Sequence, residues 1–109
     1  MEVEIVRIFT RMKGSPSPEE MRELVKELLD FCTERARKEE VLMSLEGYPE
    51  LEEHQLAHQG LQDLLVASLH DLFNGNRAST LITLEKAFFT HILLDLQFEN
   101  WIQYQKQVH

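Results

Sequence analysis

Three pairs of ionisable residues stand four positions apart in the sequence and could do chemistry together. The pairs are Arg35 with Glu39, His54 with His58, and His91 with Asp95. Residues four apart in a helix project from the same side, one turn from each other. Imidazole and carboxylate groups are the ligands expected for iron, zinc or manganese. The spacing therefore predicts a metal site if the three pairs converge.

Helices must position these pairs, and the sequence predicts four of them. Apolar residues recur at spacings of three and four over residues 2–13, 18–45, 49–73 and 79–105, without strand-like alternation. Ser17, Pro18 and Glu20 are typical of a helix N-terminus, and Gly75 is typical of a helix C-terminus. Four amphipathic helices with short connections favour an all-α fold, an up-down-up-down four-helix bundle, in one domain over residues 1–109.

Each ionisable pair lies on the apolar face of its predicted helix, where burial without a partner is costly. A single histidine on such a face is usually a hydrogen-bonded core residue. Three histidines and two carboxylates that converge from separate helices favour a shared metal ion instead.

The composition is that of an ordinary globular protein and limits the classes of function. Hydrophobic residues make up 43% and charged residues 28% of the 109 residues, and the formal net charge is −8. An acidic chain is a poor partner for nucleic acid or for an anionic membrane. The N-terminus does not resemble a signal peptide, and the single cysteine, Cys32, fits a reducing cytoplasm. Since we find no nucleophile–base pair and no phosphate loop, we expect a protein that is not an enzyme.

The segments that contain the pairs resemble the bacterial hemerythrin (HHE cation-binding) family. The similarity lies in "EEVLM" and "GYPELEEHQLAH", which begin at Glu39 and Gly47, and in "THILLD", which begins at Thr90. It covers roughly residues 20–98. It implies a hemerythrin-like four-helix bundle that holds non-heme iron and binds O2 reversibly.

The resemblance also implies which residues hold the metal. Glu39 falls on the family's bridging glutamate, His54 and His58 on the ligands of the third helix, and His91 on the ligand of the fourth helix. Asp95 resembles the bridging aspartate. It stands four residues after His91, whereas the family spacing is five.

Two ligands of the family's second iron are missing. Arg35 stands where the family has a histidine on the second helix, and the first helix offers only Glu2 near its expected histidine. Three outcomes remain open. Arg35 could pair with Glu39 and Asp95 beside one retained metal, it could neutralise them so that no metal binds, or Glu2 could complete a di-metal site with more carboxylate.

The expected function is that of a hemerythrin-like iron-binding domain, with zinc or manganese as other possible metals. It would bind or sense O2 or another small diatomic molecule, with one metal site retained and the second largely lost. The alternative is a metal-free hemerythrin scaffold that acts in regulation or protein interaction. The C-terminal aromatic cluster of Phe98, Trp101 and Tyr104 either packs at the end of the bundle or forms a homodimer surface.

Overall fold

The computed structural model describes the backbone of residues 2–108 and the side chains of residues 4–107. Within residues 2–108 the chain is all-helical and has no strand, which confirms the predicted class. The helices are α1 (Glu2–Lys13), α2 (Pro18–Glu46), α3 (Leu51–Ala67), α4 (Leu69–Asn74) and α5 (Arg77–Val108). No helix in this part of the chain is long and apolar enough to cross a membrane.

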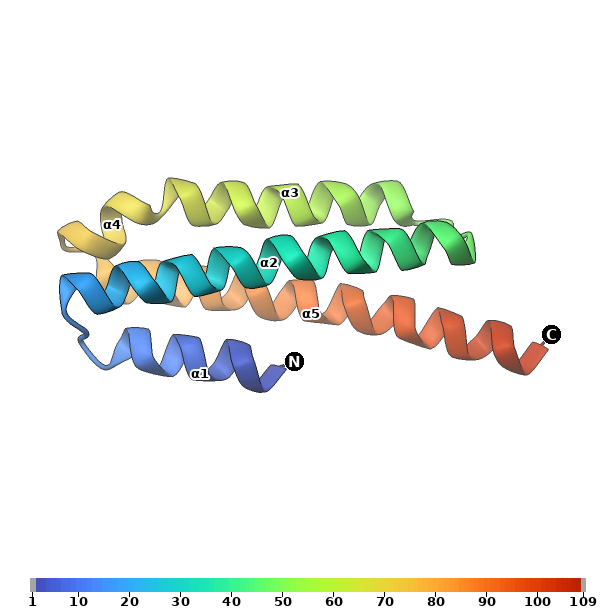
Figure 1. Ribbon diagram of the computed structural model, residues 1–109, viewed down its shortest axis with the longest axis horizontal. Helices are drawn as coiled ribbons and strands as arrows, with labels where there is room; N and C mark the ends of the chain where they lie inside the picture. Colours follow the sequence, from blue (N-terminus) through green and yellow to red (C-terminus); the bar gives the residue numbers. More distant parts are fainter. Residues whose placement is uncertain (1, 109) are drawn as a thin grey trace.

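The long helices lie side by side in an elongated body of 52 × 22 × 20 Å (Figure 1). Helix α1 packs against α2 and α5, α2 packs against α3, and α3 packs against α5. Consecutive long helices run in opposite directions, and α1 accompanies only the N-terminal part of the much longer α5 (Figure 1).

The ends of α2 follow from local sequence chemistry. The Ser17 hydroxyl accepts a hydrogen bond from the Glu20 backbone N–H at 3.2 Å, and Pro18 occupies the first turn. At the other end Gly47 has a φ of 70°. That left-handed conformation lets the Tyr48 N–H bond to the Met43 carbonyl at 2.9 Å and so closes the helix.

The predicted third helix differs from the structure. It begins at Leu51 rather than Pro49, and it is interrupted at Ser68, so that α3 and the short α4 replace one helix. The Ser68 hydroxyl donates to the Leu64 carbonyl at 2.7 Å, a competing bond that weakens a helix at that point. Gly75 ends α4, as predicted, and α5 begins at Arg77, two residues before the predicted start.

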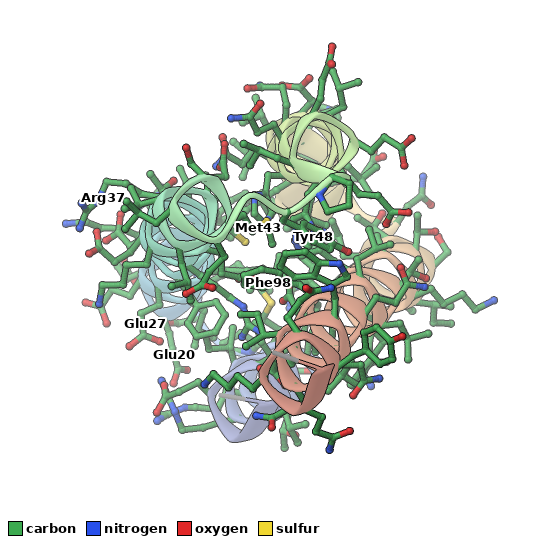
Figure 2. All side chains as sticks on the ribbon, turned by 90° about the vertical axis from the view of Figure 1, so that its right-hand side faces the viewer. Glu20, Glu27, Arg37, Met43, Tyr48 and Phe98 are labelled. Carbon is green, nitrogen blue, oxygen red and sulfur yellow. The ribbon has the colours of Figure 1, made fainter. Side chains whose placement is uncertain are left out.

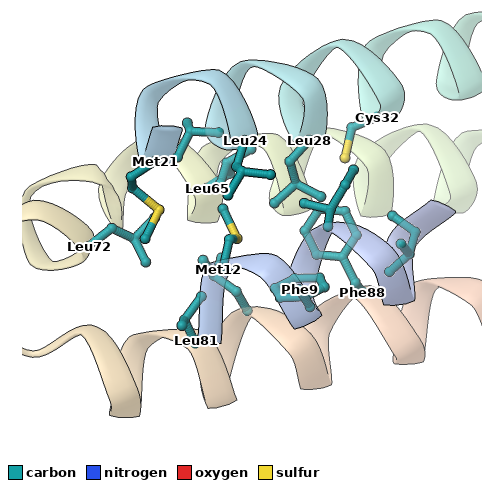
Figure 3. Close-up of a cluster of buried hydrophobic side chains, with 14 of the residues drawn as sticks. Phe9, Met12, Met21, Leu24, Leu28, Cys32, Leu65, Leu72, Leu81 and Phe88 are labelled. Carbon is teal, nitrogen blue, oxygen red and sulfur yellow. The ribbon is translucent and has the colours of Figure 1, made fainter. Parts of the chain in front are cut away.

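Two apolar clusters form the core. The larger one joins α1, α2, α3, α4 and α5, and Figure 3 shows Phe9 and Met12 of α1 among leucines of the other helices and Phe88. The Phe9 and Phe88 rings pack edge to face with centroids 5.5 Å apart. The smaller cluster contains Met43, Tyr48 and Phe98, which lie between the helices, whereas Glu20 and Arg37 lie outside (Figure 2).

The three C-terminal aromatic residues differ in how far they are buried. Phe98 is buried against Tyr48, with ring centroids 4.8 Å apart, and Trp101 is half-buried against the same tyrosine at 5.2 Å. Tyr104 alone is exposed, at 61%. Two of the three residues therefore pack within the chain, which is the packing alternative given by the sequence.

Candidate metal centre

A layer of polar side chains separates the two apolar clusters. On α2, Arg35 and Glu39 lie between Cys32 of the larger cluster and Met43 of the smaller one. On α5, His91 and Asp95 likewise fall between Phe88 and Phe98, and on α3, His54 and His58 precede Leu61. The helical period thus brings all three predicted pairs into the same layer of the interior.

Four of the five predicted metal residues form one compact group. His54, His58, His91 and Asp95 are all buried, and one ligand atom from each lies within 4.8 Å of the others. Their imidazole centroids are 4.3–5.3 Å apart. Ligand atoms about 2 Å from a common ion lie close together, so a small contraction of these side chains would enclose one metal ion.

Unpaired nitrogens show that the group fits a metal. The Nε2 atoms of His58 and His91 are both buried, and neither has a hydrogen-bond partner among the described residues. Leaving a buried polar atom unpaired costs about 1–3 kcal/mol, and most native structures avoid it. A cation between the two rings would satisfy both nitrogens at once.

A carboxylate on α2 orients the His58 ring. His58 Nδ1 lies 3.1 Å from Oε2 of Glu40, and a carboxylate accepts a hydrogen bond, so Nδ1 carries the proton. Burial lowers the pKa of His58 despite this partner. The ring is therefore neutral near pH 7, and its lone pair is on Nε2, which faces the group. Metal-binding histidines are commonly held in this way.

Burial also keeps His91 neutral, because it lowers the His91 pKa to about 4. His54 differs in having a partner inside the group: its Nε2 lies 3.0 Å from Oδ1 of Asp95. For His54 to bind an ion through that nitrogen, the proton between Nε2 and Asp95 must move elsewhere, for example to Nδ1 of the same ring.

Arg35 contacts both Glu39 and Asp95, a pairing that belongs to two of the three outcomes left open by the sequence. Its Nε donates to Oε1 of Glu39 at 2.7 Å, and its NH2 lies 2.6 Å from Oδ2 of Asp95. Glu39 thereby lies beside the four-residue group and not within it: its Oε2 is 3.9 Å from His54 Nε2.

The two carboxylates differ in their acidity. Burial, followed by the neighbouring Asp95 carboxylate, raises the Glu39 pKa to about 8. Burial also acts to raise the Asp95 pKa, but hydrogen bonds with His54 and Glu39 and the Arg35 charge outweigh it and lower the value to about 2. Asp95 is therefore the more acidic of the two carboxyl groups.

The structure shows where Asp95 lies, although it stands four residues after His91 and not five. Asp95 is buried at 2% exposure, whereas Leu96, which holds the family position, is 40% exposed. The spacing of four therefore places a carboxylate on the same face as His91. Glu2, the other proposed carboxylate, has a side chain outside the described residues.

A small cavity of about 20 Å³ adjoins the group. This is enough for one water molecule. Its polar walls are Arg35, His58, His91 and Asp95, and its apolar walls are Ile5, Phe31, Cys32, Leu61, Phe88 and Ile92. Burial raises the pKa of the Cys32 thiol to about 12, so this residue behaves as a small apolar side chain.

Sequence reasoning missed two residues of the site. Glu40 is the second member of a glutamate pair, and only its 100° offset from Glu39 around the helix could have indicated that it faces α3. Phe31 packs against Arg35: the central carbon of the guanidinium lies over the Phe31 ring, 5.8 Å from the ring centroid. Its position four residues before Arg35 was the available signal.

Comparison of the chain with protein-family models, with curated proteins and with solved structures finds no match. The fold and the site define the class themselves: an all-helical protein with a buried histidine–aspartate group that could hold a metal ion.

Proposed function

We propose that the chain is a divergent hemerythrin-like protein, an up-down-up-down four-helix bundle that binds one non-heme metal ion. The ligands are His54, His58, His91 and Asp95, a set that suits Fe(II) and also accepts Zn(II) or Mn(II). The observation that carries the proposal is the pair of buried Nε2 atoms, on His58 and His91, without hydrogen-bond partners among the described residues.

Arg35 explains why the site would hold one metal ion rather than two. Its guanidinium contacts Glu39 and Asp95, the two residues that the resemblance assigns to bridging roles. A cation already lies between those carboxylates, so the charge of a second metal ion is replaced by a side chain.

The cavity supports binding or sensing of O2 or another small diatomic molecule. Iron bound there would supply a redox-active centre with room for one further ligand. The protein side chains exclude bulk water through the apolar wall and keep His58 and His91 in the neutral form that binds a cation.

A second candidate function is a metal-free scaffold for regulation or protein interaction. The ion pairs of Arg35 favour it, because they already compensate two buried carboxylates. A chelator distinguishes the two. A bound metal would raise the melting temperature, and the chelator would lower it, whereas a metal-free scaffold would melt at the same temperature in either case.

Elemental analysis of untagged protein tests the proposal, with Arg35→His and His70→Ala variants beside it. We expect about one metal per chain, a rise toward two in Arg35→His, and no change in His70→Ala, because His70 is exposed and distant from the group. Two metals in the unmodified chain would point to a di-metal centre completed by other carboxylates. No metal in any of them would leave the scaffold function.

A further inference from the structure

We infer that Arg35 is a ligand-binding residue, and that it binds a small monoanion of one or two heavy atoms in the cavity beside His58 and His91. This inference rests on the proposed metal function. It assigns the class of ligand that the centre prefers and the residue that selects it.

The first observation is a free donor on Arg35. Its Nε and NH2 contact Glu39 and Asp95, but NH1 is buried and has no hydrogen-bond partner among the described residues. The side chain is only 10% exposed, so water does not readily satisfy it. A buried guanidinium nitrogen without a partner is a strong donor for an anion.

The second observation is the space beside this donor. Arg35 lines the cavity of about 20 Å³ together with His58 and His91, whose Nε2 atoms also lack partners. A ligand there would meet the metal ligands on one side and the guanidinium on another. Since the volume suits about one water molecule, it restricts the ligand to one or two heavy atoms.

The third observation is the balance of charge. A divalent ion and Arg35 supply three positive charges, against the carboxylates of Asp95 and Glu39. Glu40 contacts His58 from outside and is 26% exposed, so water screens its charge. The loaded centre therefore attracts an anion. Without the metal, Arg35 alone faces the two carboxylates, and an anion gains nothing there.

The fourth observation is that Arg35 is held in place before any ligand binds. Glu39 and Asp95 fix its planar group by two ion pairs, and the Phe31 ring lies 5.8 Å from its central carbon. A donor that is already oriented loses little entropy when the ligand arrives. Arg35 and Phe31 also border a groove between α1 and α2, so they separate the cavity from solvent on that side.

The test is a fluoride titration of cobalt(II)-loaded protein, followed by its visible absorption, with metal content measured in every variant. Fluoride is a monoanion close to water in size and a strong acceptor. We expect Arg35→Met to bind fluoride about ten- to a hundredfold more weakly at unchanged cobalt content. Arg37→Met is the matched control, because Arg37 lies on the same helix but is 65% exposed, and its ion-pair partner among the described residues is Glu34.

Arg35→Lys keeps the positive charge and guards against a folding failure of Arg35→Met. Lysine lacks the planar fork of donors, so weaker fluoride binding is expected here too. Equal fluoride affinity in all variants, with cobalt bound, would overturn this inference and leave the proposed metal function intact. Failure of the unmodified protein to take up cobalt would overturn both.

Discussion

The NH2 nitrogen of Arg35 lies 2.6 Å from Oδ2 of Asp95, in an ion pair between α2 and α5. The Asp95 side chain is 3% exposed, so neither charge is well solvated. A pair of this kind contributes little net stability by itself, but removing one partner leaves an uncompensated buried charge.

Replacing Arg35 with methionine in the metal-free protein is expected to lower the free energy of unfolding by about 3–5 kcal/mol. The physical reason is that Asp95 and Glu39 then lose the guanidinium that contacts both of them. Urea unfolding in the presence of a chelator measures the change. Arg37→Met should change stability by less than about 0.5 kcal/mol, and an equal effect of the two substitutions would contradict the role of the buried pair.

Changing Glu40 to glutamine is expected to weaken metal affinity about 10–100-fold. The amide oxygen of glutamine is a weaker acceptor for the Nδ1 proton of His58 than the carboxylate, and the NH2 group can face the ring instead, so Nε2 is held less firmly toward the group. Competition with a chromophoric chelator measures the affinity. Glu46→Gln, on the exposed end of the same helix, is the matched control. Unchanged affinity in Glu40→Gln would show that His58 is positioned by packing alone.

The metal-free protein should lose stability as the pH rises from about 6.5 to 8. Burial and Asp95 raise the Glu39 pKa to about 8 in the folded state, from the ordinary glutamate value of 4.5. The folded state therefore binds more protons than the unfolded state in this window. Such a contribution is complete below the unfolded pKa and is lost as the pH rises through the folded one.

We expect the loss to be about 1 kcal/mol or more over this interval, measured by urea unfolding at several pH values. Glu39→Gln should abolish the slope, because the amide does not ionise. Between about pH 4.5 and 6.5 an opposite contribution from His91 offsets that of Glu39. The His91 pKa is lowered by burial to about 4, so its contribution is lost as the pH falls from about 6.5 toward 4. A stability that rises from pH 6.5 to 8 would contradict the acidity assigned to Glu39.

Phe98→Ala is expected to cost about 3–5 kcal/mol of stability, because the ring fills the smaller apolar cluster against Tyr48. Tyr104→Ala, at an exposed position six residues further along α5, should cost less than about 0.5 kcal/mol. Thermal or urea unfolding compares the two variants. A large effect of Tyr104→Ala that depends on protein concentration would instead support the homodimer surface.

The sequence predicted the long helices, apart from the break at Ser68, and the convergence of the polar pairs, for a physical reason. The two members of each polar pair stand four residues apart on the apolar face of their helix. Since the apolar face is the side that is buried, the three pairs must all point into the interior. The pairing of Arg35 with Glu39 and Asp95 followed from the same faces and from charge. The burial of Asp95, rather than the residue after it, was also accessible from the helical period.

Other features depend on how neighbouring helices meet, which spacing does not specify. Glu40 is distinguished from Glu39 only by the position of α3 beside α2. The break at Ser68 depends on competition between a side-chain bond to Leu64 and the helical pattern. The cavity results from how Phe31, Cys32 and Phe88 fail to fill the space beside the imidazoles. None of these three features can be predicted from the residue spacing within one helix.

The polar layer between the two apolar clusters also fixes the axial alignment of the helices. Leucine-rich faces tolerate sliding, because one leucine resembles the next. A slip of one turn, about 5.4 Å, would separate Asp95 from Arg35 and leave both charges buried without this partner. The ion pair therefore favours one axial register of α2 relative to α5, with or without a metal ion.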